Sequence, residues 1–552
     1  MAAAILFLYC YSAAAQQNSS VFDRPRSYDV QHYTLRVKFD REKKLVYGDT
    51  TVTLTPLSGE LKQVDLDAVG LSFTLVKLND LATPPLYKTT AEKVNVTLDH
   101  AYKPGETINL RFVYTTKPKK GIYFIGPEVE DGKEVRSAQI WTQGEPEEAR
   151  HWFPSFDFPS DKATTEEYIS AQKDETVIAN GQLVDKVDEA DGTVTHHFKM
   201  DIPHSTYLVS FVIGKYGRAS DESRGIPLGF FVYPGKEAIV KAAFGDTGKM
   251  LAAYEDLTGV KFPYNKYDQT IVSGFDQFSG MENVTATTLA DRDVFFANFE
   301  FGKATVEDLV SHELAHSWFG DLVTCANWSE LWLNEGFATF MEAASREKLF
   351  GRDSYLRKLS ADVIEFQADD AVNKRRHALV NQNAKPDNDL FDVTTYQKGG
   401  AVVHMLREEV GDQTFWKAIN TYLNRFKYGN VRSSDLQKAM EETSGKNLDW
   451  FFRQWVYSSG YPKLNFSHAY NPAGKTLTVT LAQTQSEAAG TPAAFRLPMD
   501  IEIDTDAGQT TEHIILEKRT DKFTFKVSGA PKGVKLDPRQ AIILKSVKEP
   551  AK

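Results

Sequence analysis

Hydrophobic and polar residues alternate over several segments in the first part of the chain. His32–Phe39 and Asp49–Leu54 both place apolar residues at every second position. This period of two is typical of β-strands that bury one face. Pro, Gly, Asn and Asp punctuate the intervals, as turns require. We therefore predict an N-terminal β domain over residues 16–218.

The pattern changes to helical spacing in the middle of the chain. Apolar residues recur every three or four positions over Thr305–Leu322, Val402–Val410 and Phe415–Phe426. A strand-like segment, Tyr267–Val272, precedes these helices. Strands followed by a run of helices indicate an α+β domain, which we place at residues 219–460.

Alternation returns towards the end of the chain. Thr476–Leu481, Met499–Ile503 and Phe523–Val527 each alternate apolar and polar residues. Short strands of this kind predict a small β-sandwich over residues 461–552. The fold class expected for the whole chain is multi-domain α+β.

Composition narrows the range of functions. The chain has 552 residues and a formal net charge of −11, which argues against nucleic acid as a main partner, because phosphate binding needs a basic face. The two cysteines exclude a disulfide scaffold and a four-cysteine metal site. No apolar run reaches the ~20 residues that span a membrane, so we predict no transmembrane segment.

The first fifteen residues differ from the rest. Ala2–Tyr11 is a run of small and apolar residues, and Ser12–Ala15 offers the small residues that a signal peptidase reads. We predict that residues 1–15 are a signal peptide and that the mature protein is secreted or periplasmic. The alternative is a disordered or core-buried N-terminus, since no Lys or Arg precedes the apolar run.

A metal-binding pattern lies on one of the predicted helices. His312-Glu313-Leu314-Ala315-His316 fits H-E-x-x-H, and positions i and i+4 share one face of a helix. Both imidazoles can therefore reach one ion. Glu313 is close enough to take a proton from a water molecule on that ion without being a ligand. The alternative is a helix with two surface histidines.

A third ligand follows at a suitable distance. Eighteen residues separate His316 from Glu335, which lies in the segment Trp332–Ala338. A carboxylate on a second helix completes a set of two histidines and one glutamate, which is typical of catalytic Zn²⁺ sites that keep one position open. We expect one zinc ion per chain on these residues.

Four segments resemble one enzyme family. Residues 312–342, HELAHSWFGDLVTCANWSELWLNEGFATFME, resemble the zinc segment of the gluzincin aminopeptidases, which include the alanyl aminopeptidases and leukotriene A hydrolase. Residues 279–283, SGMEN, resemble the G-x-M-E-N exopeptidase motif of this family, with Ser279 in place of glycine. Residues 142–145, TQGE, and 396–400, YQKGG, resemble two further family segments.

The resemblance implies a fold and an activity. It implies an N-terminal β saddle, a thermolysin-like catalytic domain and a small β-sandwich. It also implies a zinc aminopeptidase that hydrolyses the first peptide bond of peptides with a free N-terminus. Members often continue into a helical C-terminal domain that roofs the active site. This chain ends at Lys552, so the expectation is a three-domain form with a more open cleft.

The resemblance also assigns roles to individual residues. It implies that Tyr396 stabilises the oxyanion and that Glu282 and Glu145 hold the substrate's ammonium group. By the same resemblance, Gln143 is expected to line the pocket for the first side chain. Met281, an adaptable apolar side chain, is expected to form part of the pocket wall. The main chain at Gly280 is expected to contact the substrate. If the motif needs a glycine-like backbone at position 279, a serine there is strained.

Three other functions remain open from the sequence. The same site could serve an epoxide hydrolase of the leukotriene type, or a zinc endopeptidase. The alternative from another class is a zinc-free binding module. Such a protein is expected to have lost a metal ligand or Glu313, but this chain keeps all of them. Cys325 is interpreted as a small core residue, since the ligand set is already complete.

Overall fold

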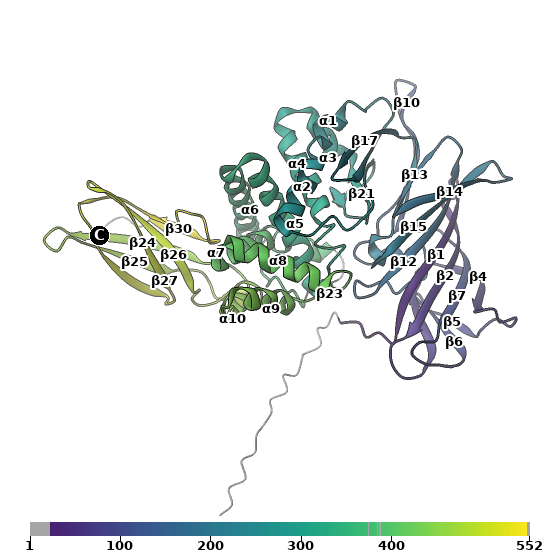
Figure 1. Cartoon of the computed structure of the whole chain (residues 1–552), viewed down its shortest axis with the longest axis horizontal. Coiled ribbons are helices and arrows are strands. Elements are labelled where there is room, and N and C mark those ends of the chain that lie inside the picture. The colour runs from purple at the N-terminus through teal and green to yellow at the C-terminus, as the bar shows by residue number, and fades with distance from the viewer. Residues whose placement is uncertain (1–22, 374, 384, 386–387, 549–552) are drawn as a thin grey trace, which may run out of the picture.

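The computed structural model describes residues 23–548 apart from 374, 384, 386 and 387. The predicted signal peptide, residues 1–15, lies outside the described residues. The chain forms an N-terminal β-rich region, a central region of helices around a small sheet, and a C-terminal β-rich region, one after another along the long axis (Figure 1). This confirms a multi-domain α+β protein, while the exact domain limits stay a prediction.

Seven strands of the N-terminal region form one mixed sheet, in the order β14-β15-β12-β1-β2-β7-β4. They are β14 (Gln182–Asp188), β15 (Thr193–Ser205), β12 (Lys162–Gln172), β1 (Tyr28–Asp40), β2 (Leu45–Pro56), β7 (Ile108–Thr116) and β4 (Ser72–Leu78). β1 and β12 pair in parallel, and the other neighbours are antiparallel. Largely alternate residues of β2 are buried, as the period of two predicts.

A four-stranded sheet leads from this region towards the centre of the molecule. Its order is β13-β16-β11-β8. The strands are β13 (Thr176–Ala179), β16 (Phe211–Gly214), β11 (Gln139–Thr142) and β8 (Ile122–Ile125). Residues 143–145 follow directly after β11, so this sheet carries Gln143 and Glu145 to the boundary with the central region.

The central region contains a five-stranded sheet in the order β17-β18-β19-β21-β20. The strands are β17 (Gly217–Ser223), β18 (Ile226–Val232), β19 (Tyr267–Val272), β21 (Ala286–Ala290) and β20 (Gly280–Met281). β18, β19 and β21 are parallel, whereas the short edge strand β20 is antiparallel to β21. β20 thus exposes one edge beside the helices.

Ten α-helices accompany this sheet in the described part of the chain. They are α1 (Ile239–Phe244), α2 (Thr247–Thr258), α3 (Asp291–Val294), α4 (Glu300–Ala315), α5 (Trp332–Phe350), α6 (Arg352–Val372), α7 (Gly399–Val410), α8 (Asp412–Phe426), α9 (Ser433–Ser444) and α10 (Asp449–Trp455). None of these described helices is both long and apolar enough to cross a lipid bilayer.

The predicted helix Thr305–Leu322 is too long at its C-terminal end. α4 ends at Ala315, and the chain turns directly after it. Nδ1 of His316 lies 2.9 Å from the carbonyl oxygen of Phe319, and Gly320 has φ +133°, a backbone conformation that favours glycine. The apolar residues that follow the turn are buried but not helical. Their spacing resembles that of a helix, which is why the predicted helix ran on to Leu322.

The C-terminal region consists of two sheets. One has the order β28-β25-β24-β30 and the other β27-β26-β29. The strands are β24 (Lys463–Asn471), β25 (Thr476–Gln483), β26 (Leu497–Thr505), β27 (Gly508–Leu516), β28 (Thr520–Lys526), β29 (Pro531–Leu536) and β30 (Lys545–Lys548). β25 buries every second residue. The three strand predictions here are confirmed, although β28 ends one residue earlier than expected.

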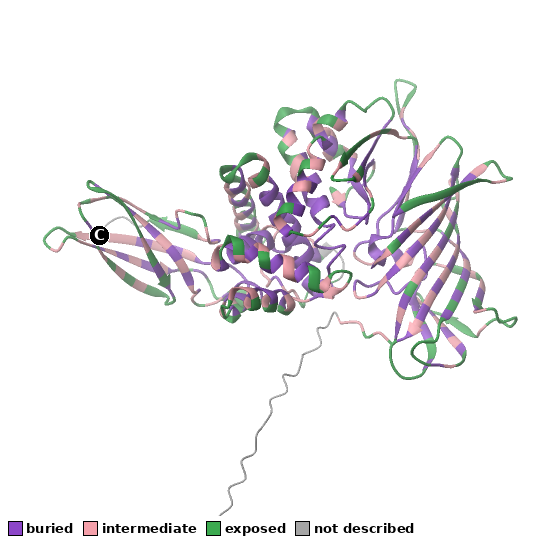
Figure 2. Ribbon diagram, in the orientation of Figure 1, coloured by how far each residue is buried: buried purple, intermediate pink, exposed green. Residues whose placement is uncertain are grey.

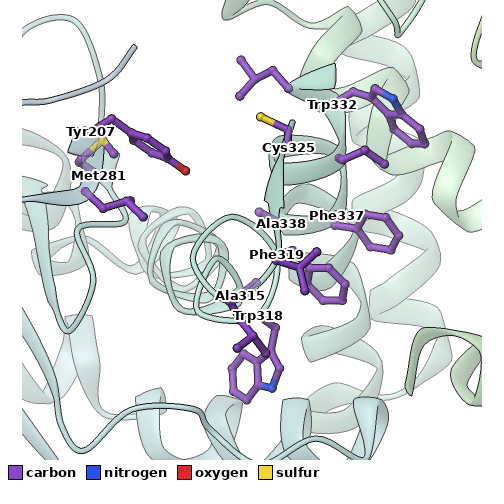
Figure 3. Close-up of a cluster of buried hydrophobic side chains, with 14 of the residues drawn as sticks. Tyr207, Met281, Ala315, Trp318, Phe319, Cys325, Trp332, Phe337 and Ala338 are labelled. Carbon is purple, nitrogen blue, oxygen red and sulfur yellow. The ribbon is translucent and has the colours of Figure 1, made fainter. Parts of the chain in front are cut away.

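A dense core holds α4 and α5 against each other. Buried residues concentrate in the central region (Figure 2). Phe319 and Phe337 stack with ring centroids 4.5 Å apart, and Trp318 and Cys325 lie in the same cluster (Figure 3). Cys325 is fully buried and is a core residue, as predicted. A packed core of this kind fixes the relative position of the two helices.

Candidate active site

The two predicted histidine ligands and the predicted glutamate meet in the structure. Nε2 of His312 lies 3.1 Å from Oε2 of Glu335, and Nε2 of His316 lies 3.4 Å from the same oxygen. His312 lies in the last turn of α4, His316 directly follows this helix, and Glu335 lies in the first turn of α5. Their three ligand atoms all lie within 4.8 Å of one another. This is the spacing that one small cation needs.

A second set of contacts orients the two imidazoles. Nδ1 of His312 lies 2.8 Å from Oε1 of Glu342, while Nδ1 of His316 faces the carbonyl oxygen of Phe319. Because a carbonyl oxygen only accepts, Nδ1 of His316 carries a proton, and Nε2 is the ring atom that would ligate a cation. Glu342 is in turn paired with Lys358 at 2.8 Å.

The sequence prediction did not identify these orienting residues. Glu342 lies seven positions after Glu335 on α5, which places both carboxylates on one face, two turns apart. That spacing was a usable signal for Glu342. Lys358 lies on α6, and only the packing of α5 against α6 brings it to Glu342.

The electrostatics of the three residues suit a divalent cation. Burial acts to raise the pKa of Glu335, but the adjacent His316 and His312 outweigh burial and lower it to about 2. The carboxylate is therefore ionised between two imidazoles, and nitrogen and oxygen donors converge on one point. The residues present thus fit a metal ion with two histidine ligands and one carboxylate ligand.

Three further buried carboxylates surround this point. Glu145, Glu282 and Glu313 are each about 95% buried, with relative exposures of 4%, 4% and 5%. Each has a buried carboxylate oxygen without a hydrogen-bond partner in the described structure, namely Oε1 of Glu145, Oε1 of Glu282 and Oε2 of Glu313. Oxygens of this kind call for a proton or a cationic partner.

Burial and mutual repulsion raise the pKa of these acids. Burial raises the pKa of Glu313 to about 8, against the lowering effect of the two histidines. For Glu145, burial and then the charge of Glu282 raise the pKa well above its usual range. Glu145, Glu282 and Glu335 bring ligand oxygens within 4.8 Å of one another. A second cation beside the metal ion would relieve this excess of negative charge.

All of these groups open into one cavity of about 840 Å³. Its lining includes Gly280 and Tyr396 as well as the acids and the histidines. A Cβ atom at position 280 would lie 2.1 Å from Oε1 of Glu313, so glycine is what lets the edge strand β20 approach this carboxylate. Ser279 is not among the described residues with positive φ, and the expected strain at this position is therefore not observed.

Gln143 and Met281 are buried and contact each other. Both are 2% exposed, and Nε2 of Gln143 donates to Sδ of Met281 at 3.2 Å. Neither belongs to the described residues that line the cavity. The structure thus brings the two residues together with each other, and their contact with a substrate side chain stays a prediction.

Tyr396 lines the cavity beside the metal ligand His312. It belongs to a π-helical turn, Thr394–Lys398, just before α7. Its ring is nearly parallel to that of His312, with centroids 5.8 Å apart. Burial and then the negative charge of Glu335 raise the pKa of Tyr396 well above its usual range. The hydroxyl is therefore protonated and able to donate a hydrogen bond.

A His–Asp pair holds the start of this turn, and the sequence prediction missed it. Oδ1 of Asp392 accepts hydrogen bonds from the backbone N–H groups of Thr394 and Thr395, both at 3.0 Å. Nε2 of His377 lies 2.7 Å from Oδ2 of the same carboxylate. The carbonyl oxygen of Asp392 also accepts from the backbone N–H of Tyr396. Asp392 thus positions the turn that carries Tyr396.

Family models and similar curated proteins both relate this chain to one family of peptidases. The model for the Peptidase M1 N-terminal domain matches residues 29–208, and the model for the Peptidase family M1 domain matches residues 242–455. Similar curated proteins include Probable aminopeptidase 2 of Sulfurisphaera tokodaii, 28% identical, covering 90% of this chain and 61% of that protein. Aminopeptidase 2 of Candida albicans is 27% identical, with coverages of 91% and 53%.

Glutamyl aminopeptidase of Sus scrofa is 28% identical over 79% of this chain and 48% of its own length. The chain thus spans about half to three-fifths of the length of these relatives. The two family models match successive parts of the chain and together cover more than two thirds of the described residues, with the metal ligands inside the second match. On these grounds the chain belongs to peptidase family M1.

Proposed function

We propose that this protein is a zinc-dependent aminopeptidase that hydrolyses the first peptide bond of peptides with a free N-terminus. The observation that carries the proposal is the pair of buried, partly unpartnered carboxylates, Glu145 and Glu282, beside the donor set of His312, His316 and Glu335. One part of the cavity suits a metal ion, and the adjacent part suits a substrate ammonium group. The relatives named above are all aminopeptidases, which supports the same activity.

Zinc suits this donor set best among common cations. Two imidazole nitrogens and one carboxylate oxygen are typical of catalytic zinc sites with an open position. When bound, the ion supplies Lewis acidity, which makes a water molecule more acidic and polarises the carbonyl of the scissile bond. His312, His316 and Glu335 hold it, and Glu342 keeps His312 in the ligating orientation.

Glu313 acts as the general base in this proposal. Its Oε2 is buried and unpartnered, while its Oε1 faces the backbone of Gly280. Oε2 accepts a proton from the attacking water and then passes it to the nitrogen of the departing amine. The phenol of Tyr396 donates a hydrogen bond to the oxyanion that forms as the carbonyl carbon becomes tetrahedral.

Glu145 and Glu282 select the end of a peptide chain. An ammonium group placed between them forms charge-assisted hydrogen bonds with both carboxylates. An internal peptide segment offers no charge and would leave the two acids buried and unpaired, which is costly. The acids therefore set the distance between the amino group and the bond that is cut.

Removal of the metal ion is expected to abolish activity and lower thermal stability. The reason is that binding to the folded state alone stabilises it by mass action, and that four acids lose their counter-charge. The measurements are hydrolysis of an aminoacyl p-nitroanilide and the melting temperature, before and after dialysis against a chelator and after addition of Zn²⁺. Full activity in metal-free protein, verified by elemental analysis, would contradict the proposal.

Tyr396→Phe is expected to lower kcat about 10²- to 10³-fold with little change in KM, since one oxyanion donor is lost. The variant keeps the ring that stacks on His312. Zinc content should therefore equal that of the wild type. A main effect on KM would indicate that Tyr396 contacts the substrate in its ground state instead.

Asp392→Ala is expected to lower kcat roughly tenfold to a hundredfold through misplacement of Tyr396. The distinguishing measurement is the same substitution in the Tyr396→Phe background, where no further loss is expected. Asp500→Ala is the matched control, because Asp500 pairs with His513 at 3.0 Å in the C-terminal region. An additive loss in the double variant would show that Asp392 does not act through Tyr396.

The proposed function also implies a domain type for each of the three regions and a location of the protein in the cell. We infer a β saddle, a thermolysin-like catalytic domain and a β-sandwich for the three regions. We also infer secretion or export to the periplasm after removal of residues 1–15. The support for export is the apolar run Ala2–Tyr11 followed by small residues.

A further inference from the structure

Three exposed phenylalanines form a patch at the start of α4. Phe296, Phe299 and Phe301 have relative exposures of 47%, 55% and 74%. The rings of Phe299 and Phe301 stack with centroids 5.4 Å apart, and Phe296 lies 6.4–6.5 Å from both. Single exposed apolar side chains are common, but a contiguous aromatic group marks a binding surface. We call these three residues the aromatic patch.

The aromatic patch is continuous with the catalytic cavity. Phe296 itself lines that cavity. So does one face of α4, because the lining residues recur every three or four positions along it: Thr305, Val306, Asp308, Leu309, His312, Glu313 and His316. The cavity therefore runs along α4 from the metal ligands to the patch.

The direction in which a peptide lies along α4 follows from the positions of Glu145 and Glu282. Glu282 groups with His316, at the C-terminal end of α4, and Glu145 groups with Glu282 and Glu335. The aromatic patch lies at the opposite end of the helix. A peptide whose ammonium group is held by Glu145 and Glu282 therefore continues past His312 towards the N-terminus of α4.

The helix also gives the length of this path. Thirteen positions separate Phe299 from His312, which corresponds to about 20 Å at a rise of about 1.5 Å per residue. An extended peptide covers about 3.3 Å per residue. A side chain about six residues beyond the scissile bond therefore reaches the patch.

We propose that the aromatic patch is a distal binding site for an apolar side chain of the substrate, near its seventh residue. The inference rests on the proposed aminopeptidase function and adds a substrate class, oligopeptides of about seven residues or more with an apolar residue near that position. Partial burial of the exposed rings of Phe299 and Phe301 supplies the affinity. Binding of the ammonium group by Glu145 and Glu282 fixes which substrate residue lies at the patch.

The test compares three peptides with the same first three residues. One is a tripeptide, and two are nonapeptides with Phe or Ser as the seventh residue. For the wild type, kcat/KM is expected to be about tenfold higher for the Phe nonapeptide than for the Ser nonapeptide. In Phe299→Ser/Phe301→Ser this ratio should fall to about one. Phe350→Ser, which removes a 51% exposed phenylalanine outside the cavity, should keep the wild-type ratio.

Several outcomes would overturn the inference. One is equal turnover of the two nonapeptides by the wild type. Another is a ratio that survives loss of both rings. A third is concentration-dependent self-association that the double variant abolishes, since a second copy of the chain would then cover the patch. If even the tripeptide is not cleaved, the proposed function fails. Fluorescence anisotropy of C-terminally labelled nonapeptides then makes the same Phe-to-Ser comparison through binding.

Discussion

Glu313→Gln is expected to lower kcat about 10²- to 10⁴-fold, the usual contribution of a positioned general base. Glutamine has nearly the same shape as glutamate, so it fits against Gly280 and leaves His312, His316 and Glu335 in place. Only the capacity to take a proton is lost. The measurement is the steady-state rate with an aminoacyl p-nitroanilide, together with zinc content by elemental analysis.

The matched control for this change is Glu307→Gln. Glu307 lies on the same helix, α4, but does not line the cavity. This variant should retain wild-type kcat. If Glu313→Gln keeps most of its activity with zinc bound, another group takes the proton, and the assignment of Glu313 as base is wrong.

Glu282→Gln is expected to lower kcat/KM for free-amine substrates about 10²- to 10³-fold. The reason is that loss of one partner of a buried charge pair costs several kcal/mol. N-acetylated substrates have no ammonium group to lose, so the preference for a free amine should shrink by the same factor. The measurement is kcat/KM for matched free and acetylated p-nitroanilides.

Glu145→Gln is expected to act in the same way, because Glu145 and Glu282 are proposed to bind the same ammonium group. It should shrink the same preference. If either variant lowers turnover of free and acetylated substrates equally, that glutamate supports the site in general and does not recognise the amine.

Much of the strand content could be predicted from alternation alone. β1 and β19 lie where the pattern placed strands, because burial of one or both faces leaves a direct trace in the residue types. The parallel pairing of β1 with β12 could not be predicted in this way. His32 lies opposite Thr164, more than a hundred residues away, and alternation identifies a buried face but not the neighbouring strand.

The candidate site was predictable where its residues share one short segment. H-E-x-x-H places both histidines on one helical face, and Glu335 follows within the same block. Asp392 and His377 escaped prediction because their role depends on a π-helical turn, which has no simple sequence period. The expected contact of Gln143 and Met281 with a substrate side chain stays a prediction, since the structure shows only that the two residues are buried and contact each other.

The measurement that tests the central claim most directly is the hydrolysis of aminoacyl p-nitroanilides as free amines and as their N-acetylated counterparts, with and without a chelator. The aminopeptidase proposal predicts that only the free amines are cleaved and that the chelator stops the reaction. Equal cleavage of the acetylated compounds would contradict it, because Glu145 and Glu282 would then recognise no amine.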